Sequence, residues 1–345
     1  MPTLNHNNAN ESIANSPLPW QIDVWNRLCS QVKQQRLAHA YLLCGERGLG
    51  KRKFAIAAAR LLLCDKPFVT APCGTCNNCL FSRNSHHPDL LYVAPEDGGR
   101  VLKVDQVRAL GKFTDKTAHS AHRKVVITEQ SDALNNSAAN ALLKTLEEPA
   151  GSTVLLLLSD KPGSLLPTIR SRCQRISFVT PERDIALAWL SAVMEEQKNL
   201  AEVLDLAGGK PILAQELYNS GELEQRQNII RAFVQIAEGK LDPIEFAATA
   251  KSLNVSFVMD YLWQTTALII KYLLCKDEAM LANSEIRTIV TKLQKNGRKD
   301  DDSLSRLLQL NHAAEEAKRQ LGSPSNPNQQ LIFEGMMWRW SRIMA

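Results

Sequence analysis

Five short apolar segments, separated by stretches of helical character, constrain the fold of this chain more than any other feature. They are residues 40–44 (AYLLC), 89–94 (DLLYVA), 124–128 (KVVIT), 153–159 (TVLLLLS) and 173–179 (CQRISFV). Most are nearly continuous rather than alternating, as expected of strands that are covered on both faces. Helical patterns follow the first and third segments, at residues 51–63 and 137–149. Strands that alternate with helices predict a parallel α/β sheet, ending near Val179.

No segment after residue 179 predicts a strand. The stretch from Thr180 begins a helix in which Thr180 is the expected N-cap and Pro181 the first helical residue. The LAGGKP turn at 206–211 is expected to close a small helical domain. Two later helices each place apolar side chains on one face: Trp263, Ala267, Ile270 and Leu274, and then Ile332, Met336, Trp340 and Ile343.

The expected organisation therefore has four parts. Residues 1–16 have neither the apolar core of a signal peptide nor an arginine-rich amphipathic pattern, so they predict a disordered leader. An α/β domain over 17–179, a small helical lid over 180–210 and a helical oligomerisation domain over 211–345 follow.

Composition excludes several classes of protein. Hydrophobic residues make up 44% of the 345, yet no apolar run approaches the length of a membrane span. The net charge of +5 permits contact with nucleic acid without requiring it. Eight cysteines without a secretory signal indicate a reducing cytoplasm, where clustered thiols bind metal more often than they form disulfides.

The sequence GERGLGKR, which begins at Gly45, resembles a phosphate-binding loop and lies between a predicted strand and a predicted helix. In such loops, glycines let backbone N–H groups surround phosphates and a lysine, here Lys51, neutralises their charge. The residue after the lysine is normally Ser or Thr, which binds magnesium. Arg52 stands there after Gly50 and Lys51 and has no oxygen to offer.

The acidic half of the site is also altered. The third apolar segment is followed by Glu129 and Gln130, where an active enzyme has one acid for the metal and a second to polarise water. Glu129 could still approach a metal, but Gln130 cannot act as a base. An ordinary turn would explain both defects but not the surviving glycines. We interpret the loop as a vestigial nucleotide site without activity.

Four cysteines are grouped within sixteen residues, with the spacing C-x8-C-x2-C-x2-C: Cys64, Cys73, Cys76 and Cys79. Four thiolates in one short turn-rich segment suit a tetrahedral zinc site, and four sulfur ligands make such a site structural rather than catalytic. An iron–sulfur cluster and free thiols are the alternatives. His86 and His87, which follow, are interpreted as surface or loop histidines.

Three arginines, Arg170, Arg172 and Arg175, surround the start of the fifth apolar segment. An arginine at such an edge can reach a nucleotide on a neighbouring subunit and stabilise the transferring phosphoryl group. The residues themselves do not select among the three.

Taken together, "LPWQ", "QQRLAHAYLLCGERGLGK", the four-cysteine insert, "HPDLLYVAPE", "ANALLKTLEEP", "TIRSRC" and "NPNQQLIFE" resemble the AAA+ clamp-loader family of bacterial DNA polymerase III, and within it the delta-prime group. The resemblance runs from about Pro19 to the end of the chain and is densest over 36–178.

The resemblance implies a subunit of a five-membered ring, beside a delta subunit and the gamma or tau ATPase subunits, that hydrolyses no ATP itself. Its Ser-Arg-Cys motif, here Ser171, Arg172 and Cys173, would supply an arginine finger to the adjacent ATP site. The zinc ligands of the family match the four cysteines, and the C-terminal helices would form a collar. The ring opens the sliding clamp and places it on primed DNA, as part of a DNA-directed DNA polymerase, a nucleotidyltransferase.

Two other hypotheses stay open at this point. A weak ATPase of the gamma or tau type would use Lys51 and Glu129. A zinc-containing module that binds nucleic acid without ring partners would need basic and aromatic side chains around the cysteines, and the segment CGTCNNC carries few.

Overall fold

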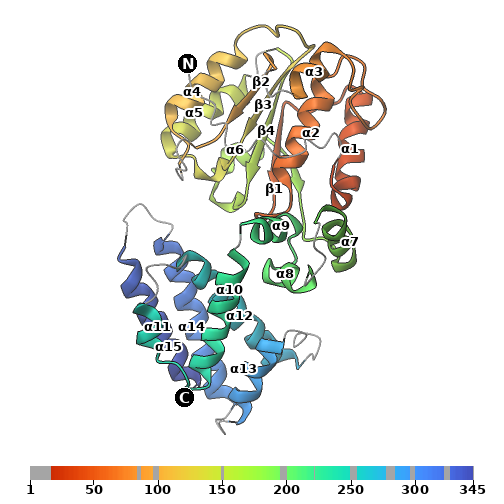
Figure 1. Cartoon of the computed structure of the whole chain (residues 1–345). Coiled ribbons are helices and arrows are strands. Elements are labelled where there is room, and N and C mark those ends of the chain that lie inside the picture. Colours follow the sequence, from red (N-terminus) through yellow and green to blue (C-terminus); the bar gives the residue numbers. More distant parts are fainter. Residues whose placement is uncertain are drawn as a thin grey trace. The chain divides into compact units, whose positions relative to one another are not determined.

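The computed structural model describes residues 17–83, 87–95, 101–148, 151–194, 200–220, 222–248, 255–276, 284–295, 300–321 and 327–344. The predicted leader, residues 1–16, lies outside this part of the chain. Contacts divide the molecule into two compact units, residues 1–219 and 220–345 (Figure 1). The finer division predicted at residues 179 and 210 stays a prediction.

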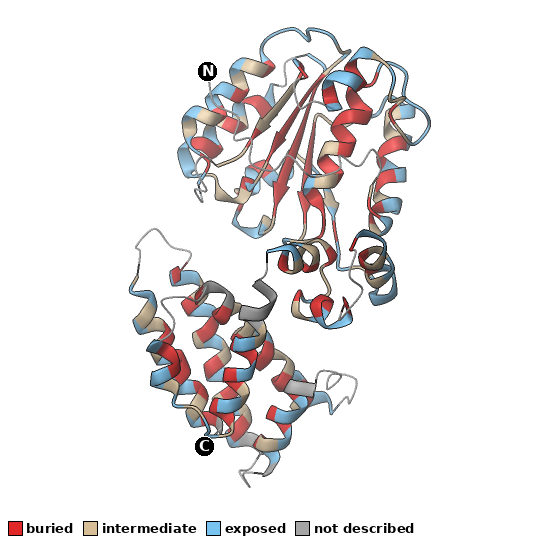
Figure 2. Ribbon diagram, viewed as in Figure 1, coloured by how far each residue is buried: buried red, intermediate tan, exposed pale blue. Residues whose placement is uncertain are grey.

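A five-stranded parallel sheet forms the centre of the first unit, as predicted. Its strands are β1 (Ala40–Cys44), β2 (Leu90–Val93), β3 (Lys124–Thr128), β4 (Thr153–Ser159) and β5 (Gln174–Ser177), in the order β2-β3-β4-β1-β5. Each strand lies inside the apolar segment that predicted it. β1, β3 and β4 are buried along their whole length because helices cover both of their faces (Figure 2).

Two helical layers cover the sheet (Figure 1). One layer contains α1 (Ile22–Lys33) and α2 (Lys51–Leu63), and the other contains α4 (Val104–Thr114), α5 (Asn136–Glu147) and α6 (Pro167–Ser171). Because side chains alternate along a strand, Tyr41 and Leu43 of β1 pack with α1 and α2, whereas Leu42 and Cys44 pack with the other layer. The 3-10 helices are η1 (Pro19–Gln21), η3 (Ser131–Ala133) and η4 (Pro162–Ser164).

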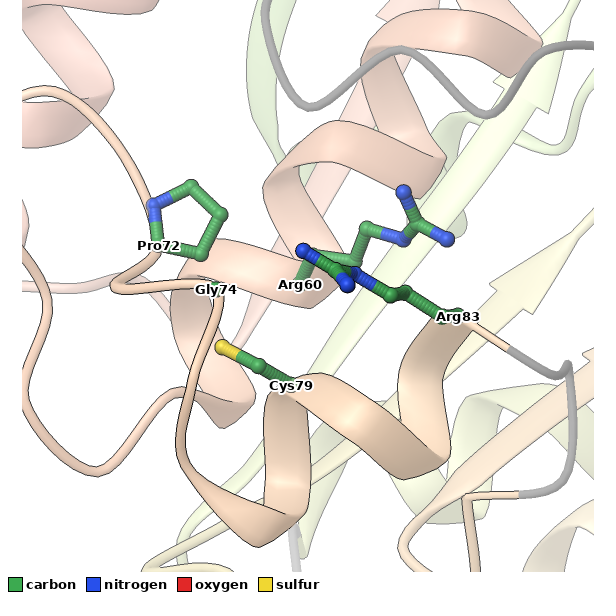
Figure 3. A pocket seen from close by; sticks show the side chains of 5 residues that line it. All are labelled: Arg60, Pro72, Gly74, Cys79 and Arg83. Atoms are coloured by element: carbon green, nitrogen blue, oxygen red, sulfur yellow. The ribbon is translucent and has the colours of Figure 1, made fainter.

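The four-cysteine segment forms an insert that contains α3 (Asn77–Arg83), beside α2. A small pocket between the two is lined by Arg60, Pro72, Gly74, Cys79 and Arg83 (Figure 3).

Helices α7 (Arg183–Val193), α8 (Leu200–Leu206) and α9 (Pro211–Asn219) complete the first unit. The predicted N-cap at Thr180 is wrong, because α7 begins at Arg183 with Glu182 as N-cap. The chain is still extended after β5, where the Phe178 N–H donates to the Cys44 carbonyl at 2.7 Å. The predicted turn separates α8 from α9, with Gly208 and Gly209 at φ +63° and +75°.

The described residues of the second unit form helices and their connections, without a strand. It consists of α10 (Glu222–Ala237), α11 (Pro243–Ala248), α12 (Val255–Cys275), α13 (Ser284–Lys295), α14 (Asp300–Leu321) and α15 (Gln329–Met344). The fold class is thereby confirmed. None of the helices in the described part of the chain is long and apolar enough to cross a membrane.

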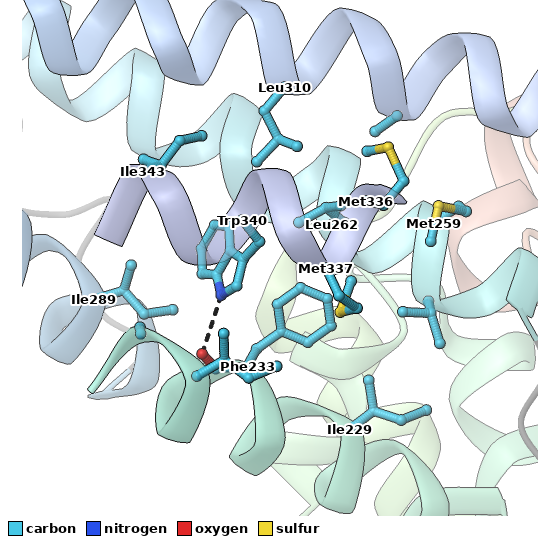
Figure 4. Packing of buried hydrophobic residues seen from close by; sticks show 14 of the residues in the cluster. Ile229, Phe233, Met259, Leu262, Ile289, Leu310, Met336, Met337, Trp340 and Ile343 are labelled. Atoms are coloured by element: carbon cyan, nitrogen blue, oxygen red, sulfur yellow. Dashed lines mark hydrogen bonds between the residues drawn. The ribbon is translucent and has the colours of Figure 1, made fainter. Parts of the chain in front are cut away.

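One apolar core holds these helices together, with Trp340 of α15 at its centre (Figure 4). The Trp340 ring meets Phe233 edge to face at 5.4 Å, and its indole N–H donates to the Phe233 carbonyl at 3.1 Å. The face predicted for α15 is confirmed. The face predicted for α12 is only partly right: Ile270 is buried and Trp263 packs against the core, but Leu274 is exposed, and Met259 and Leu262, which were not predicted, are fully buried. Because α12 is apolar around most of its circumference, periodicity does not locate its buried face.

Candidate nucleotide-loop, arginine and metal sites

The glycine-rich loop connects β1 to α2, so Lys51 becomes the first residue of the helix. Gly50 lies at φ +81°, and a Cβ there would stand 2.3 Å from Leu18 Cδ1, so the position requires glycine. The Gln21 side chain, fully buried, donates to the carbonyls of Leu49 and Gly50 at 3.0 and 3.1 Å. The loop is therefore fixed by the protein itself.

Lys51 is also fully engaged. Its ammonium donates to the carbonyls of Gly45 and Glu46 at 2.6 and 2.7 Å, and pairs with Asp160, which follows β4, at 2.6 Å. An ammonium has three donors, and all three are used here. The side chain of Lys51 is buried, and its bonds to the Gly45 and Glu46 carbonyls show that it is folded back onto its own loop.

Arg52 takes the place of the metal-binding hydroxyl and contacts the predicted acid. Its Nε lies 3.0 Å from Glu129 Oε1, and its guanidinium lies over the Tyr92 ring, 5.4 Å from the ring centre. The Tyr92 hydroxyl donates to the same carboxylate. Burial, followed by the nearby Glu129 charge, raises the pKa of Tyr92. A cationic side chain thus neutralises the carboxylate that faces magnesium in active loops of this kind.

The other side of the loop contacts α9. The Ile212 N–H donates to the Gly48 carbonyl at 3.1 Å, and Lys210 pairs with Glu46 at 2.6 Å. A Cβ on Gly48 would lie 2.5 Å from Leu213 Cβ, so helix and loop are in close contact.

A cleft of about 410 Å³ opens at the ends of β1, β4 and β5. Gly45, Glu46, Asp160 and Arg175 line it. Lys51, Arg52 and Glu129 do not line it, although the Lys51 ammonium contacts three of its lining residues, Gly45, Glu46 and Asp160.

Arg172 lies at the C-terminal end of α6, as predicted. Its Nη2 pairs with Glu147 Oε1 at 2.7 Å, and its Nη1 donates to the Thr168 carbonyl at 3.0 Å. Of the three predicted arginines, Arg172 is the one with an ion pair to a described residue. Both side chains of the pair are partly exposed, at 37% for Arg172 and 50% for Glu147.

The residues on either side of Arg172 in the Ser-Arg-Cys motif also make contacts within the first unit. The Ser171 hydroxyl donates to the Thr168 carbonyl at 3.1 Å, and Cys173 packs toward the core. Burial raises the pKa of Cys173 to about 12, so its thiol stays protonated.

Arg172 and the glycine-rich loop lie at opposite edges of the sheet. Arg172 precedes β5, which runs parallel to β1 with Gln174 beside Tyr41, while the loop follows Cys44 at the other end of β1. The four residues of β1 from Tyr41 to Cys44 separate these two ends of the strands by about 13 Å. Arg172 therefore cannot contact a phosphate held by its own loop.

The four predicted cysteines come together, with all sulfur atoms within 4.8 Å of one another. Cys64 and Cys76 are 4.0 Å apart at sulfur, and Cys73 and Cys79 are 3.8 Å apart. A tetrahedral zinc with Zn–S bonds of about 2.3 Å requires sulfur separations of about 3.8 Å. The cluster fits a metal ion, and its four sulfurs leave no position open for a substrate.

Backbone N–H groups support these sulfurs. The N–H groups of Cys73 and Cys76 donate to the sulfurs of Cys64 and Cys73 at 3.3 and 3.4 Å. Hydrogen bonds from the backbone of Thr75 and Cys76 lower the pKa of Cys73 to about 6, whereas burial raises the pKa of Cys64 and Cys79.

His87 was not recognised as a structural residue. His87 lies in the loop before β2, as predicted, but it is buried and not on the surface, while His86 lies outside the described residues. Its Nδ1 accepts from the Asp89 N–H at 3.0 Å, so its Nε2 donates to Asn78 Oδ1 at 3.1 Å. The His-Pro-Asp sequence just before β2 was the available signal. His87 connects the insert to the sheet.

A parallel sheet of this order, with a glycine-rich loop after β1, an acid after β3, an arginine before β5 and helices after the sheet, defines a P-loop protein of the AAA+ type. The loop identifies the class even though its metal-binding positions are changed.

Two family models match the chain: DNA polymerase III, delta subunit, over residues 20–182, and DNA polymerase III, delta subunit, C terminal, over 220–342. The DNA polymerase III subunit delta' of Pseudomonas aeruginosa is 34% identical over 94% of this chain and 97% of its own length. That of Haemophilus influenzae is 36% identical over 62% and 65%. The DNA polymerase III subunit tau of Bacillus subtilis is 26% identical over 70% and 44%. This chain belongs to the family of the delta' subunits of DNA polymerase III.

Proposed function

We propose that this chain is the delta' subunit of the DNA polymerase III clamp loader and that it acts on its neighbour's nucleotide instead of its own. It would join gamma or tau ATPase subunits and a delta subunit in a ring. The assembled ring would open the sliding clamp and place it on primed DNA in the cytoplasm.

One observation carries the proposal: Arg172 stands at the sheet edge opposite the chain's own loop, with its guanidinium partly exposed. A group so placed can serve a phosphate only on another subunit. Arginine fingers of this kind contribute roughly 10³- to 10⁵-fold to hydrolysis at the site they complete.

The chain's own loop supports the same function. Lys51 is bound to loop carbonyls and Asp160, and Arg52 is bound to Glu129, so the two positions that meet phosphate and magnesium are occupied by internal contacts. We propose that the loop is vestigial and that this chain hydrolyses no ATP.

We further propose that Cys64, Cys73, Cys76 and Cys79 bind structural zinc. Sulfur-only ligands and sulfur separations of 3.8 and 4.0 Å support zinc. When bound, the ion would cross-link the two ends of the insert, because Cys64 follows α2 and Cys79 lies on α3.

The test is ATP hydrolysis by the reconstituted loader with clamp and primed DNA present. We expect Arg172→Ala to lower the rate markedly, although ATP sites completed by other subunits keep part of it. Lys51→Ala and the control Arg170→Ala should leave the rate nearly unchanged. Loss of activity in Lys51→Ala, with Arg172→Ala unaffected, would instead identify the chain as a weak gamma- or tau-like ATPase.

A further inference from the structure

Two arginine side chains lie beside Cys79, one of the four clustered cysteines. Arg60 comes from α2 and Arg83 ends α3, and with Cys79 they line one small pocket of about 10 Å³ (Figure 3). The Arg83 guanidinium lies over the turn between Cys73 and Cys76: a Cβ added to Gly74 would be 3.4 Å from Arg83 Nη2.

Arg60 is placed where a cation is costly. Only 3% of the residue is exposed, and its Nη2 donates to the Ser82 carbonyl of α3 at 3.1 Å. Arg83 brings a second guanidinium to the same pocket. A buried cation next to a second cation needs negative charge close by.

The metal-bound cluster has that charge. Four thiolates and one divalent cation carry a net charge of −2, and two guanidinium groups carry +2. We propose that Arg60 and Arg83 balance the charge of the metal–thiolate cluster and thereby raise its affinity for the ion. This inference rests on the proposed zinc site. Groups outside the ligand set commonly change metal affinity by roughly 10- to 100-fold.

The same arrangement connects the metal to the core of the first unit. Arg60 lies on α2, the helix that begins at the glycine-rich loop, and its bond to Ser82 joins α2 to α3. With the metal bound, the attraction between the negatively charged cluster and the two arginines would stabilise this contact between α2 and α3.

The test is zinc affinity of the full chain, measured by competition with a chromophoric chelator. We expect Arg60→Met and Arg83→Met each to weaken zinc binding by roughly tenfold. Arg83→Lys keeps the charge and should stay close to wild type. Because Arg83 is exposed, its effect should shrink as salt rises from about 0.05 to about 0.5 M. Arg108→Met on α4, which removes an exposed cation on the opposite face of the sheet, is the control for net charge.

Two further measurements keep the result interpretable. The cobalt(II)-substituted protein reports four-sulfur coordination by its absorption, and circular dichroism shows whether Arg60→Met is folded; if it is not, Arg83→Met carries the test. Wild-type affinity in Arg83→Met, or equal losses in Arg83→Lys and Arg83→Met, would overturn the charge-balance proposal. Failure of the wild-type chain to bind zinc or cobalt would overturn the metal site on which it rests.

Discussion

At the scale of single residues, Arg52 changes the nucleotide site in two ways. It removes the hydroxyl that would bind magnesium, and its guanidinium occupies the Glu129 carboxylate at 3.0 Å. Tyr92 holds the same carboxylate from a neighbouring strand. As a result, the Glu129 carboxylate is already neutralised by the Arg52 guanidinium and does not require a metal ion for this.

This arrangement predicts that Arg52→Thr partly restores a magnesium site. Threonine supplies the missing hydroxyl and frees Glu129, whereas Gly45, Gly50 and Lys51 remain in place. We expect magnesium-dependent ATP binding roughly tenfold tighter than in wild type, or about 1.4 kcal/mol. A fluorescent ATP analogue titrated with and without magnesium measures it.

Arg52→Met is the matched control, because it removes the same ion pair without adding an oxygen. It should bind the analogue no more tightly when magnesium is added. Equal magnesium dependence in Arg52→Met and Arg52→Thr would show that the hydroxyl is not the missing element.

The sequence predicted which residues of the site are changed, but it did not predict the contacts that these residues make. The defect at Arg52 is visible because the loop pattern specifies the side chain after the lysine. The contacts of Lys51 with Asp160 and of Arg52 with Glu129 are not visible in the sequence. Each contact joins residues that follow or flank different strands, and it depends on which rotamers the side chains adopt. His87 was missed for the same reason, since its partners Asn78 and Asp89 are determined by how the insert folds back on β2.

At the scale of elements, strands were predicted better than helix faces. A short apolar run bounded by turns allows little freedom, so the strands fall within the predicted segments. In α12 the apolar side chains surround the helix, and its buried face depends on which neighbours cover it. In α15 the predicted face is the buried one, although Leu331 and Trp338 are exposed on the same helix, and the prediction of Trp340 as a core residue is confirmed.

Trp340 also offers a test of the second unit. Trp340→Phe removes the hydrogen bond to the Phe233 carbonyl and leaves a cavity in the core (Figure 4). We expect the free energy of unfolding to fall by about 2–3 kcal/mol. Urea unfolding followed by circular dichroism measures this change.

Trp338→Phe is the control on the same helix, since Trp338 is 51% exposed. It should change the free energy of unfolding by no more than about 0.5 kcal/mol. Similar losses in the two variants would mean that Trp340 contributes no more to the core than a surface residue does.

At the scale of the whole molecule, the first unit has two sites at opposite ends of its parallel strands: the glycine-rich loop and Arg172. Its own loop is closed by internal contacts, and the arginine that could act on ATP stands at the other edge of the sheet. Arg172 is nevertheless held: Glu147 pairs with one end of its guanidinium, and the Thr168 carbonyl accepts from the other. Such a pair orients the guanidinium before a neighbouring subunit binds, so less side-chain freedom is lost on assembly.

If Glu147 orients Arg172, Glu147→Ala should weaken the finger without abolishing it, because the bond to Thr168 remains. An exposed ion pair contributes up to about 1 kcal/mol, so we expect a roughly two- to fivefold lower rate at the ATP site that Arg172 completes. The loss should be smaller than in Arg172→Ala, and Glu148→Ala, at the exposed neighbouring residue, should leave the rate unchanged. Single-turnover hydrolysis by the reconstituted loader measures these rates. A wild-type rate in Glu147→Ala, alongside a strong defect in Arg172→Ala, would retain the arginine finger and remove Glu147 from its support.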